Sequence, residues 1–197
     1  MDSEYPQDIG FTVHEGHFQL TSGLHSPFYN QTAEVHQHPG ACTAACSALL
    51  RQLGTIGVTG FDVVVAPAAG AVVFGFELAR QAAVPFLYSE RVEGRQRLRR
   101  GQKLKPGQRV LVVENVITTA GTVVEVLDLL ASAGAAPAAV AALVVRRGAP
   151  FAWEDGVPLV ALTRKDMPAF SPDDCPLCRQ GIRLVSPGSK YLAEAAR

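Results

Sequence analysis

The stretch VLVVENVITTAGT at residues 110–122 decides how this chain folds. Its first half is a run of aliphatic and β-branched residues, which is typical of a buried strand. Glu114 and Asn115 follow, and then small hydroxyl residues lead to Gly121. This order predicts a strand, a turn and the start of a helix. The free N–H groups at the start of a helix favour binding of a phosphate. An ordinary helix whose N-terminus is capped by threonine would have the same sequence pattern.

Helical and strand patterns alternate from residue 41 onward. Helices are expected at 41–54, 69–83 and 121–134, and strands at 61–67, 84–90, 109–116, 138–146 and 157–163. Nearly continuous apolar strands between helices predict an α/β fold with a parallel sheet covered on both faces. Residues 1–40 and 164–197 are richer in Pro, Gly, His and Ser, so we expect them to wrap the sheet as irregular lids.

Three loops are expected at the carboxyl edge of this sheet, where ligands of open α/β sheets bind. They are residues 66–71, 90–103 and 114–122. The first is APAAGA, whose small side chains let the backbone approach a diphosphate, or form a tight packing turn. The convergence of the three loops indicates one ligand site.

Residues 90–105 carry a local positive charge in a chain whose 18 Lys and Arg balance 18 Asp and Glu. The segment holds seven basic residues against Glu90 and Glu93: Arg91, Arg95, Arg97, Arg99, Arg100, Lys103 and Lys105. With Gly94 and Gly101 it is expected to be a mobile loop or a hairpin that closes over a polyphosphate. A solvated surface and a nucleic-acid patch are the alternatives, but no interleaved aromatics favour single-strand binding.

Composition sets limits on the class of protein. A chain of 197 residues suits one domain, and its zero net charge gives no general attraction to nucleic acid or membranes. The acidic start MDSEYPQDIG is unlike a signal peptide, and no apolar run is long enough to cross a bilayer. Four cysteines do not form a dense disulfide framework. We therefore expect a cytoplasmic protein with reduced thiols.

Taken together, these segments resemble the type I phosphoribosyltransferases. Residues 63–81 resemble the diphosphate loop of that family, residues 88–102 its catalytic loop, and VLVVENVITTAGT its phosphoribosyl diphosphate motif. The hood GHFQLTSGLHSPFY (16–29) and the tail CPLCRQGIRLVSPGS (175–189) resemble the orotate branch. The resemblance implies a single phosphoribosyltransferase-like domain over 1–197, with an N-terminal hood at about 10–40 and a tail at about 164–197. It also implies Mg²⁺ as cofactor and a homodimer in which the basic loop reaches the neighbouring site.

The resemblance implies transfer of a phosphoribosyl group from 5-phospho-α-D-ribose 1-diphosphate to orotate, giving orotidine 5'-monophosphate and diphosphate. It assigns catalytic roles to Arg91, Arg95, Glu114 and Asn115, and orotate contact to Arg146. Substrate binding falls on Ala68, Ala69 and Gly70, and on Glu114, Asn115, Val116, Ile117, Thr118, Thr119, Ala120, Gly121 and Thr122. No protein side chain is expected to ligate a metal directly.

Several positions depart from the family pattern. Asn115 stands where a second acid is usual, and Thr32 where this branch often has lysine. Arg95 replaces a lysine, Val145 an acid and Ala71 a glycine. Two alternatives therefore stay open: transfer to a different base, and a weakened paralogue that binds phosphoribosyl diphosphate or a nucleotide without turnover.

The cysteines and histidines give little support for zinc. Cys175 and Cys178 form a CxxC pair, but Cys42 and Cys46 lie one turn apart in an apolar helix, where buried side chains are the simpler interpretation. The five histidines, at positions 14, 17, 25, 36 and 38, have spacings that match no metal motif. His25, in the hood, is the one expected near a ligand.

Overall fold

The computed structural model describes residues 13–147 and 150–187. At its centre is a six-stranded sheet in the order β5-β4-β3-β6-β7-β8. Its strands are β3 (Val63–Pro67), β4 (Phe86–Val92), β5 (Arg95–Leu98), β6 (Arg109–Ile117), β7 (Ala136–Val145) and β8 (Leu159–Arg164). All pair in parallel except β5, which runs antiparallel to β4 at the edge. The predicted α/β fold with a parallel sheet is confirmed.

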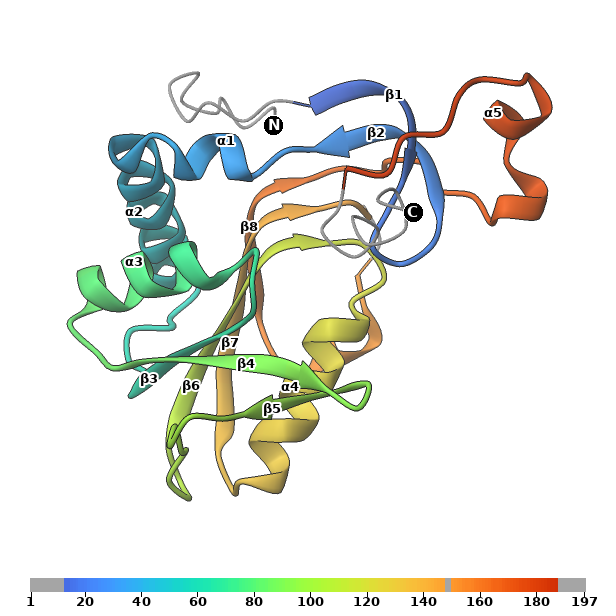
Figure 1. The fold of residues 1–197 in the computed structure, drawn as a ribbon. Coiled ribbons are helices and arrows are strands. Elements are labelled where there is room, and N and C mark those ends of the chain that lie inside the picture. The colour runs from blue at the N-terminus through green and yellow to red at the C-terminus, as the bar shows by residue number, and fades with distance from the viewer. Residues whose placement is uncertain (1–12, 148–149, 188–197) are drawn as a thin grey trace.

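Helices cover both faces of the sheet (Figure 1). On one face lie α2 (Pro39–Thr55) and α3 (Val72–Ala82), and on the other lies α4 (Gly121–Ser132). Successive residues of β3 point to opposite faces. Val64 accordingly packs in the cluster with α2 and α3, while Val63 and Val65 pack with α4. This two-sided burial explains why the strands read as continuous apolar runs.

The segment before α2 is more regular than expected. Strands β1 (Val13–Gln19) and β2 (His25–Asn30) form an antiparallel hairpin, followed by the short helix α1 (Ala33–His36). The prediction of an irregular lid is therefore wrong for these residues. The tail contributes backbone partners to both strands, since Gln19 N–H donates to the Val185 carbonyl and His25 N–H donates to the Phe170 carbonyl. Hood and tail thus form one layer across the top of the sheet (Figure 1).

Short helices complete the second half of the chain: η2 (Ala152–Asp155), η3 (Pro172–Asp174) and α5 (Pro176–Arg179). The expected acidic N-terminus, the start of the hood and the end of the tail lie outside the described residues. Helix boundaries shift by one to three residues from those expected: α2 runs from Pro39 through Gly54 to Thr55, α3 begins at Val72 after a turn, and α4 ends at Ser132. Among the described residues, no helix is long and apolar enough to span a membrane.

Candidate active site

Two of the three predicted loops meet at the end of β6. A Cβ atom built on Gly70 would lie 2.7 Å from Nδ2 of Asn115, closer than side chains tolerate. Any larger residue at position 70 would displace the Asn115 side chain, because the backbone of the small-residue turn packs directly on the Asn115 carboxamide. The predicted contact between residues 66–71 and 114–122 is confirmed. Ala68 and Ala69 precede this contact and are joined by a cis peptide bond.

Glu114 and Asn115 differ in environment although they are adjacent on β6. Glu114 is buried, and desolvation raises the pKa of its carboxyl to about 7, although the N–H of Asn115 donates to Oε1 at 2.9 Å and opposes the shift. Asn115 is half-buried and donates from Nδ2 to the Thr32 hydroxyl at 2.8 Å. The Glu114 carboxyl thus has a pKa near neutral pH. The Asn115 side chain connects β6 to the hood through its hydrogen bond to Thr32.

The turn into α4 leaves the helix N-terminus uncapped. Its N-cap is Ala120, in the left-handed region at φ 63°, and no side chain of the described residues caps the helix. The alternative of an ordinary threonine-capped helix is therefore wrong. The first-turn N–H groups, those of Gly121 and Thr122 among them, have no acceptor within the helix. Because the first turn holds no acidic residue, this end is suited to an anion.

The remaining residues of the motif divide between this turn and the core. Thr118 and Thr122 are half-buried and Thr119 is exposed, so their hydroxyls lie at or near the surface of the turn. Ile117 is buried in the cluster with α4, and Val116 packs against the cluster on the other face. The side chains of Val116 and Ile117 serve the core, and only their backbone groups are available to a ligand.

Arg146 carries a buried positive charge next to the hood. Its side chain is 4% exposed, and it donates from Nη1 to Asn30 Oδ1 and from Nη2 to Ser26 Oγ, both at 2.7 Å. Both acceptors are neutral, and burial lowers the pKa of the guanidinium to about 10. Among the described residues, Arg146 Nε and Asn30 Nδ2 have no hydrogen-bond partner. An anionic ligand with several acceptors would satisfy this group.

Residues 90–98 form the expected hairpin. Its turn residues, Glu93 and Gly94, have φ of 50° and 79°, as a two-residue type I′ connection requires. Arg91 donates to the Gly94 carbonyl and forms an ion pair with Glu125 of α4 at 2.9 Å. Arg95 pairs with Val92, the neighbour of Arg91 in the ladder, so Arg91 and Arg95 point to opposite faces of the ribbon. The structure does not bring these two arginines together.

The residues at the end of β6 fit Mg²⁺ only as a partner of a substrate. The site offers one carboxylate, Glu114, and the amide oxygen of Asn115. Within residues 13–147 and 150–187, the one group of three or more His, Cys, Asp or Glu side chains close enough to share an ion lies elsewhere. A single carboxylate suits Mg²⁺ that is held mainly by substrate phosphates and water, in keeping with the expectation that no protein side chain ligates it directly.

Reasoning from the sequence missed three polar residues of this region. Ser26 and Asn30 hold Arg146, and Thr32, noted only as a departure, binds Asn115. All three are buried. The signal available in the sequence was the polar residues at both ends of HSPFYNQT, but nothing there identified their partners more than 80 residues away.

Comparisons with known proteins agree with this geometry. Residues 31–166 match the phosphoribosyl transferase domain family. The chain is 43% identical over 176 residues to an orotate phosphoribosyltransferase of Caldicellulosiruptor bescii, covering 89% of this chain and 90% of that one. Its fold is similar to the orotate phosphoribosyltransferase of Aeropyrum pernix (24% identity, TM-score 0.58, 93% and 92% of the chains covered). It is also similar to adenine phosphoribosyl transferase from Trypanosoma brucei (17% identity, TM-score 0.65, 100% and 94% covered).

Proposed function

The chain belongs to the orotate phosphoribosyltransferase family, and we propose that it transfers the phosphoribosyl group of 5-phospho-α-D-ribose 1-diphosphate to orotate. The products are orotidine 5'-monophosphate and diphosphate, which makes it a glycosyltransferase of pyrimidine nucleotide biosynthesis. The described chain acts as one phosphoribosyltransferase-like domain with its hood and tail. A cytoplasmic location stays a prediction.

The anions of the substrates have separate places in this proposal. The uncapped start of α4 and the hydroxyls of Thr118, Thr119 and Thr122 take the 5'-phosphate. The turn of Ala68, Ala69 and Gly70 takes the diphosphate through its backbone. Arg91 and Arg95 neutralise the charge that develops on the diphosphate as it leaves.

The ribose ring lies over Glu114 and Asn115. Positive charge develops on the ring carbon as the diphosphate departs, and the ionised Glu114 stabilises it while Asn115 hydrogen-bonds a hydroxyl. Mg²⁺ would neutralise charge on the diphosphate, and it would be held mainly by the substrate's own oxygens and water, with the Glu114 carboxylate nearby. The protein contributes mainly positioning and electrostatics, because the pyrimidine nitrogen is itself the nucleophile.

The observation that carries the choice of base is the buried Arg146 with neutral partners. Orotate bears a carboxylate, whereas adenine and uracil do not. A buried guanidinium that donates to the neutral side chains of Asn30 and Ser26 therefore favours orotate. The relatives named as orotate phosphoribosyltransferases support the same base.

The test is a product assay with purified protein, Mg²⁺ and phosphoribosyl diphosphate. Orotate, adenine and uracil are offered separately, and nucleotide and diphosphate are separated by chromatography. We expect orotidine 5'-monophosphate from orotate alone, with loss of the product when Mg²⁺ is chelated. A nucleotide from adenine or uracil but not orotate would assign a different base. Calorimetric binding of phosphoribosyl diphosphate without any product would indicate a binding protein instead.

A homodimer is part of the proposal. An apolar patch joins α3 and β4: the ring of Phe76, which is 58% exposed, contacts Phe86, and Phe86 stacks on Tyr88. Val73, also exposed, lies three residues before Phe76 on α3. A patch of this kind marks an association surface. In the dimer the basic hairpin reaches the site of the neighbouring subunit, as the family resemblance implies.

A further inference from the structure

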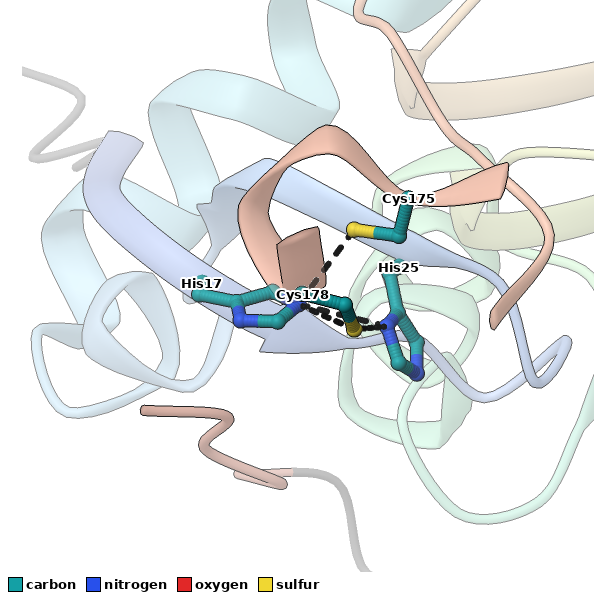
Figure 2. Close-up of side chains that lie close together, drawn as sticks. All are labelled: His17, His25, Cys175 and Cys178. Carbon is teal, nitrogen blue, oxygen red and sulfur yellow. Dashed lines mark hydrogen bonds between the residues drawn. The ribbon is translucent and has the colours of Figure 1, made fainter. Parts of the chain in front are cut away.

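Four side chains from the hood and the tail converge on one point away from the candidate active site. They are His17 of β1, His25 of β2, Cys175 before α5 and Cys178 within α5, and Figure 2 shows them facing one another. Each offers one ligand atom, and all four atoms lie within 4.8 Å of one another. His17, His25 and Cys175 are buried, whereas Cys178 is exposed.

Four of the six distances between the ligand atoms match a tetrahedral site, and the other two are within 4.8 Å. With Zn–N near 2.0–2.1 Å and Zn–S near 2.3 Å, tetrahedral geometry places two nitrogens about 3.3 Å apart and a nitrogen and a sulfur about 3.6 Å apart. His17 Nε2 lies 3.2 Å from His25 Nδ1. The nitrogen–sulfur distances are 3.5 Å (Cys175 to His17), 3.7 Å (Cys178 to His17) and 3.3 Å (Cys178 to His25).

The second nitrogen of His17 fixes which atom faces the cluster. Its Nδ1 donates to the Ile182 carbonyl at 2.7 Å. The proton then lies on Nδ1, and Nε2 directs a lone pair at His25 and the two sulfurs. A backbone carbonyl that orients a histidine in this way is typical of metal ligands.

The local backbone positions both the histidine pair, His17 and His25, and the cysteine pair, Cys175 and Cys178. The register of the β1–β2 hairpin shifts between Glu15 and Phe18, and His17 lies within this irregularity, where a bulge can redirect a side chain. On the tail, the N–H of Arg179 bonds to the Cys175 carbonyl and closes a tight turn around the CxxC pair. Val185 N–H donates to the His17 carbonyl and Phe170 pairs with His25, so the tail flanks both histidines.

We propose that His17, His25, Cys175 and Cys178 bind one structural Zn²⁺ that fastens the tail to the hood. Two thiolates and two imidazoles in a tetrahedral arrangement select zinc over the hard cations Mg²⁺ and Ca²⁺. Four protein ligands leave no open position, so the ion has a structural rather than a catalytic role. The site is distinct from the Mg²⁺ of the proposed reaction and does not depend on that reaction.

The proposed ion would hold strand β2 in place against the tail. His25 is followed by Ser26, which holds Arg146 and donates its own hydroxyl to the Pro168 carbonyl of the tail. The ion therefore anchors the strand that positions the buried guanidinium. Sequence patterns hid this arrangement because the CxxC pair and the two histidines are about 160 residues apart.

The first test is metal analysis of protein purified without a metal-binding tag. We expect about one zinc per chain, falling at least fivefold in Cys178→Ser and in His25→Gln. The matched controls are Cys42→Ser, in the other cysteine pair, and His38→Gln, whose exposed ring makes no capping bond at α2; both should keep the zinc. The proposal would be overturned if the wild-type protein contained no zinc and also failed to bind added Zn²⁺. Full zinc retention in a Cys175→Ser/Cys178→Ser variant would overturn it as well.

A second measurement keeps the proposal testable if the variants do not fold. Stripped wild-type protein is titrated with Co²⁺, which should give the intense thiolate-to-cobalt absorption and the visible bands of a tetrahedral site at one equivalent. Added Zn²⁺ should displace the cobalt and raise the melting temperature by about 10 °C. Octahedral cobalt spectra without thiolate bands would contradict the assignment.

Discussion

The Asn115 carboxamide donates to the Thr32 hydroxyl at 2.8 Å, so two departures from the family pattern are in direct contact. The family resemblance implies an acid at one of these positions and, in its orotate branch, often a lysine at the other. Here a potential ion pair is replaced by a neutral hydrogen bond in a buried setting, since Thr32 is 5% exposed. The two positions are thus linked by one hydrogen bond.

A double-mutant cycle tests this coupling. Asn115→Asp alone puts a carboxylate beside the buried Glu114 and should lower the free energy of unfolding at pH 8 by about 1–3 kcal/mol. Thr32→Lys alone buries an amine without a partner and should also destabilise. The free energy of unfolding of the double variant, measured with urea, should be about 1–3 kcal/mol higher than the summed losses of the two single variants predict. Additivity within about 0.5 kcal/mol would show that the two positions are independent. Turnover measured in parallel tells whether the restored acid improves catalysis.

The contribution of Glu114 to the free energy of unfolding should fall as pH rises from about 5 to 7. Its folded pKa is raised to about 7 from the ordinary value of 4.5, so the folded state holds the proton more tightly than the unfolded chain does. The stabilising effect is complete below pH 4.5 and is lost as pH rises through 7, amounting to about 3 kcal/mol. Urea unfolding of Glu114→Gln should lack this decline. Asp128→Asn, an exposed control on α4, should retain it. Parallel pH profiles for wild type and Glu114→Gln would falsify the assignment.

The sequence predicted the sheet well because its strands are buried on both faces. Residues such as Val63, Val64 and Val65 supply a signal that survives without knowledge of the neighbours. It also predicted the loops at the carboxyl ends, because strand order and short connections bring them to one edge.

What could not be predicted depends on contacts across long sequence separations. The hood hairpin lacks a continuous apolar run and gains partners from the tail, at Val185 and Phe170. The Asn115–Thr32 and Arg146–Ser26 bonds likewise join residues 83 and 120 positions apart. The uncapped start of α4 is a backbone property, since Ala120 adopts a left-handed φ that its identity does not suggest.

Arg146 should control the affinity for orotate. Arg146→Lys keeps a positive charge but loses the planar fork whose two Nη atoms bond Asn30 and Ser26, so the KM for orotate should rise at least tenfold. The KM for phosphoribosyl diphosphate should change little. Arg147→Lys is the control, because Arg147 is exposed and stacks on Phe151 instead. Equal rises in both KM values would point to a general loss of hood structure.

The patch around Phe76 should govern oligomeric state. Phe76→Asp replaces an exposed ring and should convert a dimer to monomers in light scattering, with little loss of stability because the ring is mostly solvent-exposed. Ile56→Asp changes a similarly exposed apolar residue, 49% exposed, beyond the end of α2, and should leave the dimer intact. A dimer that persists in Phe76→Asp would place the interface elsewhere, and a monomeric wild type would remove the dimer from the proposal.

The two hairpin arginines should differ in their effect on catalysis. Arg91 is held by Glu125 on α4, whereas Arg95 has no side-chain bond of its own among the described residues. If Arg95 stabilises the leaving diphosphate, Arg95→Ala should lower kcat by about 10²–10³-fold with a smaller change in KM. Arg97→Ala changes an exposed residue of the same strand and is the control; its kcat should stay within about twofold of the wild type.

Glu125→Gln frees Arg91 from its ion pair. A kcat that rises in Glu125→Gln and falls in Arg91→Ala would show that the pair restrains the hairpin, whereas no change in either would exclude Arg91 from the reaction.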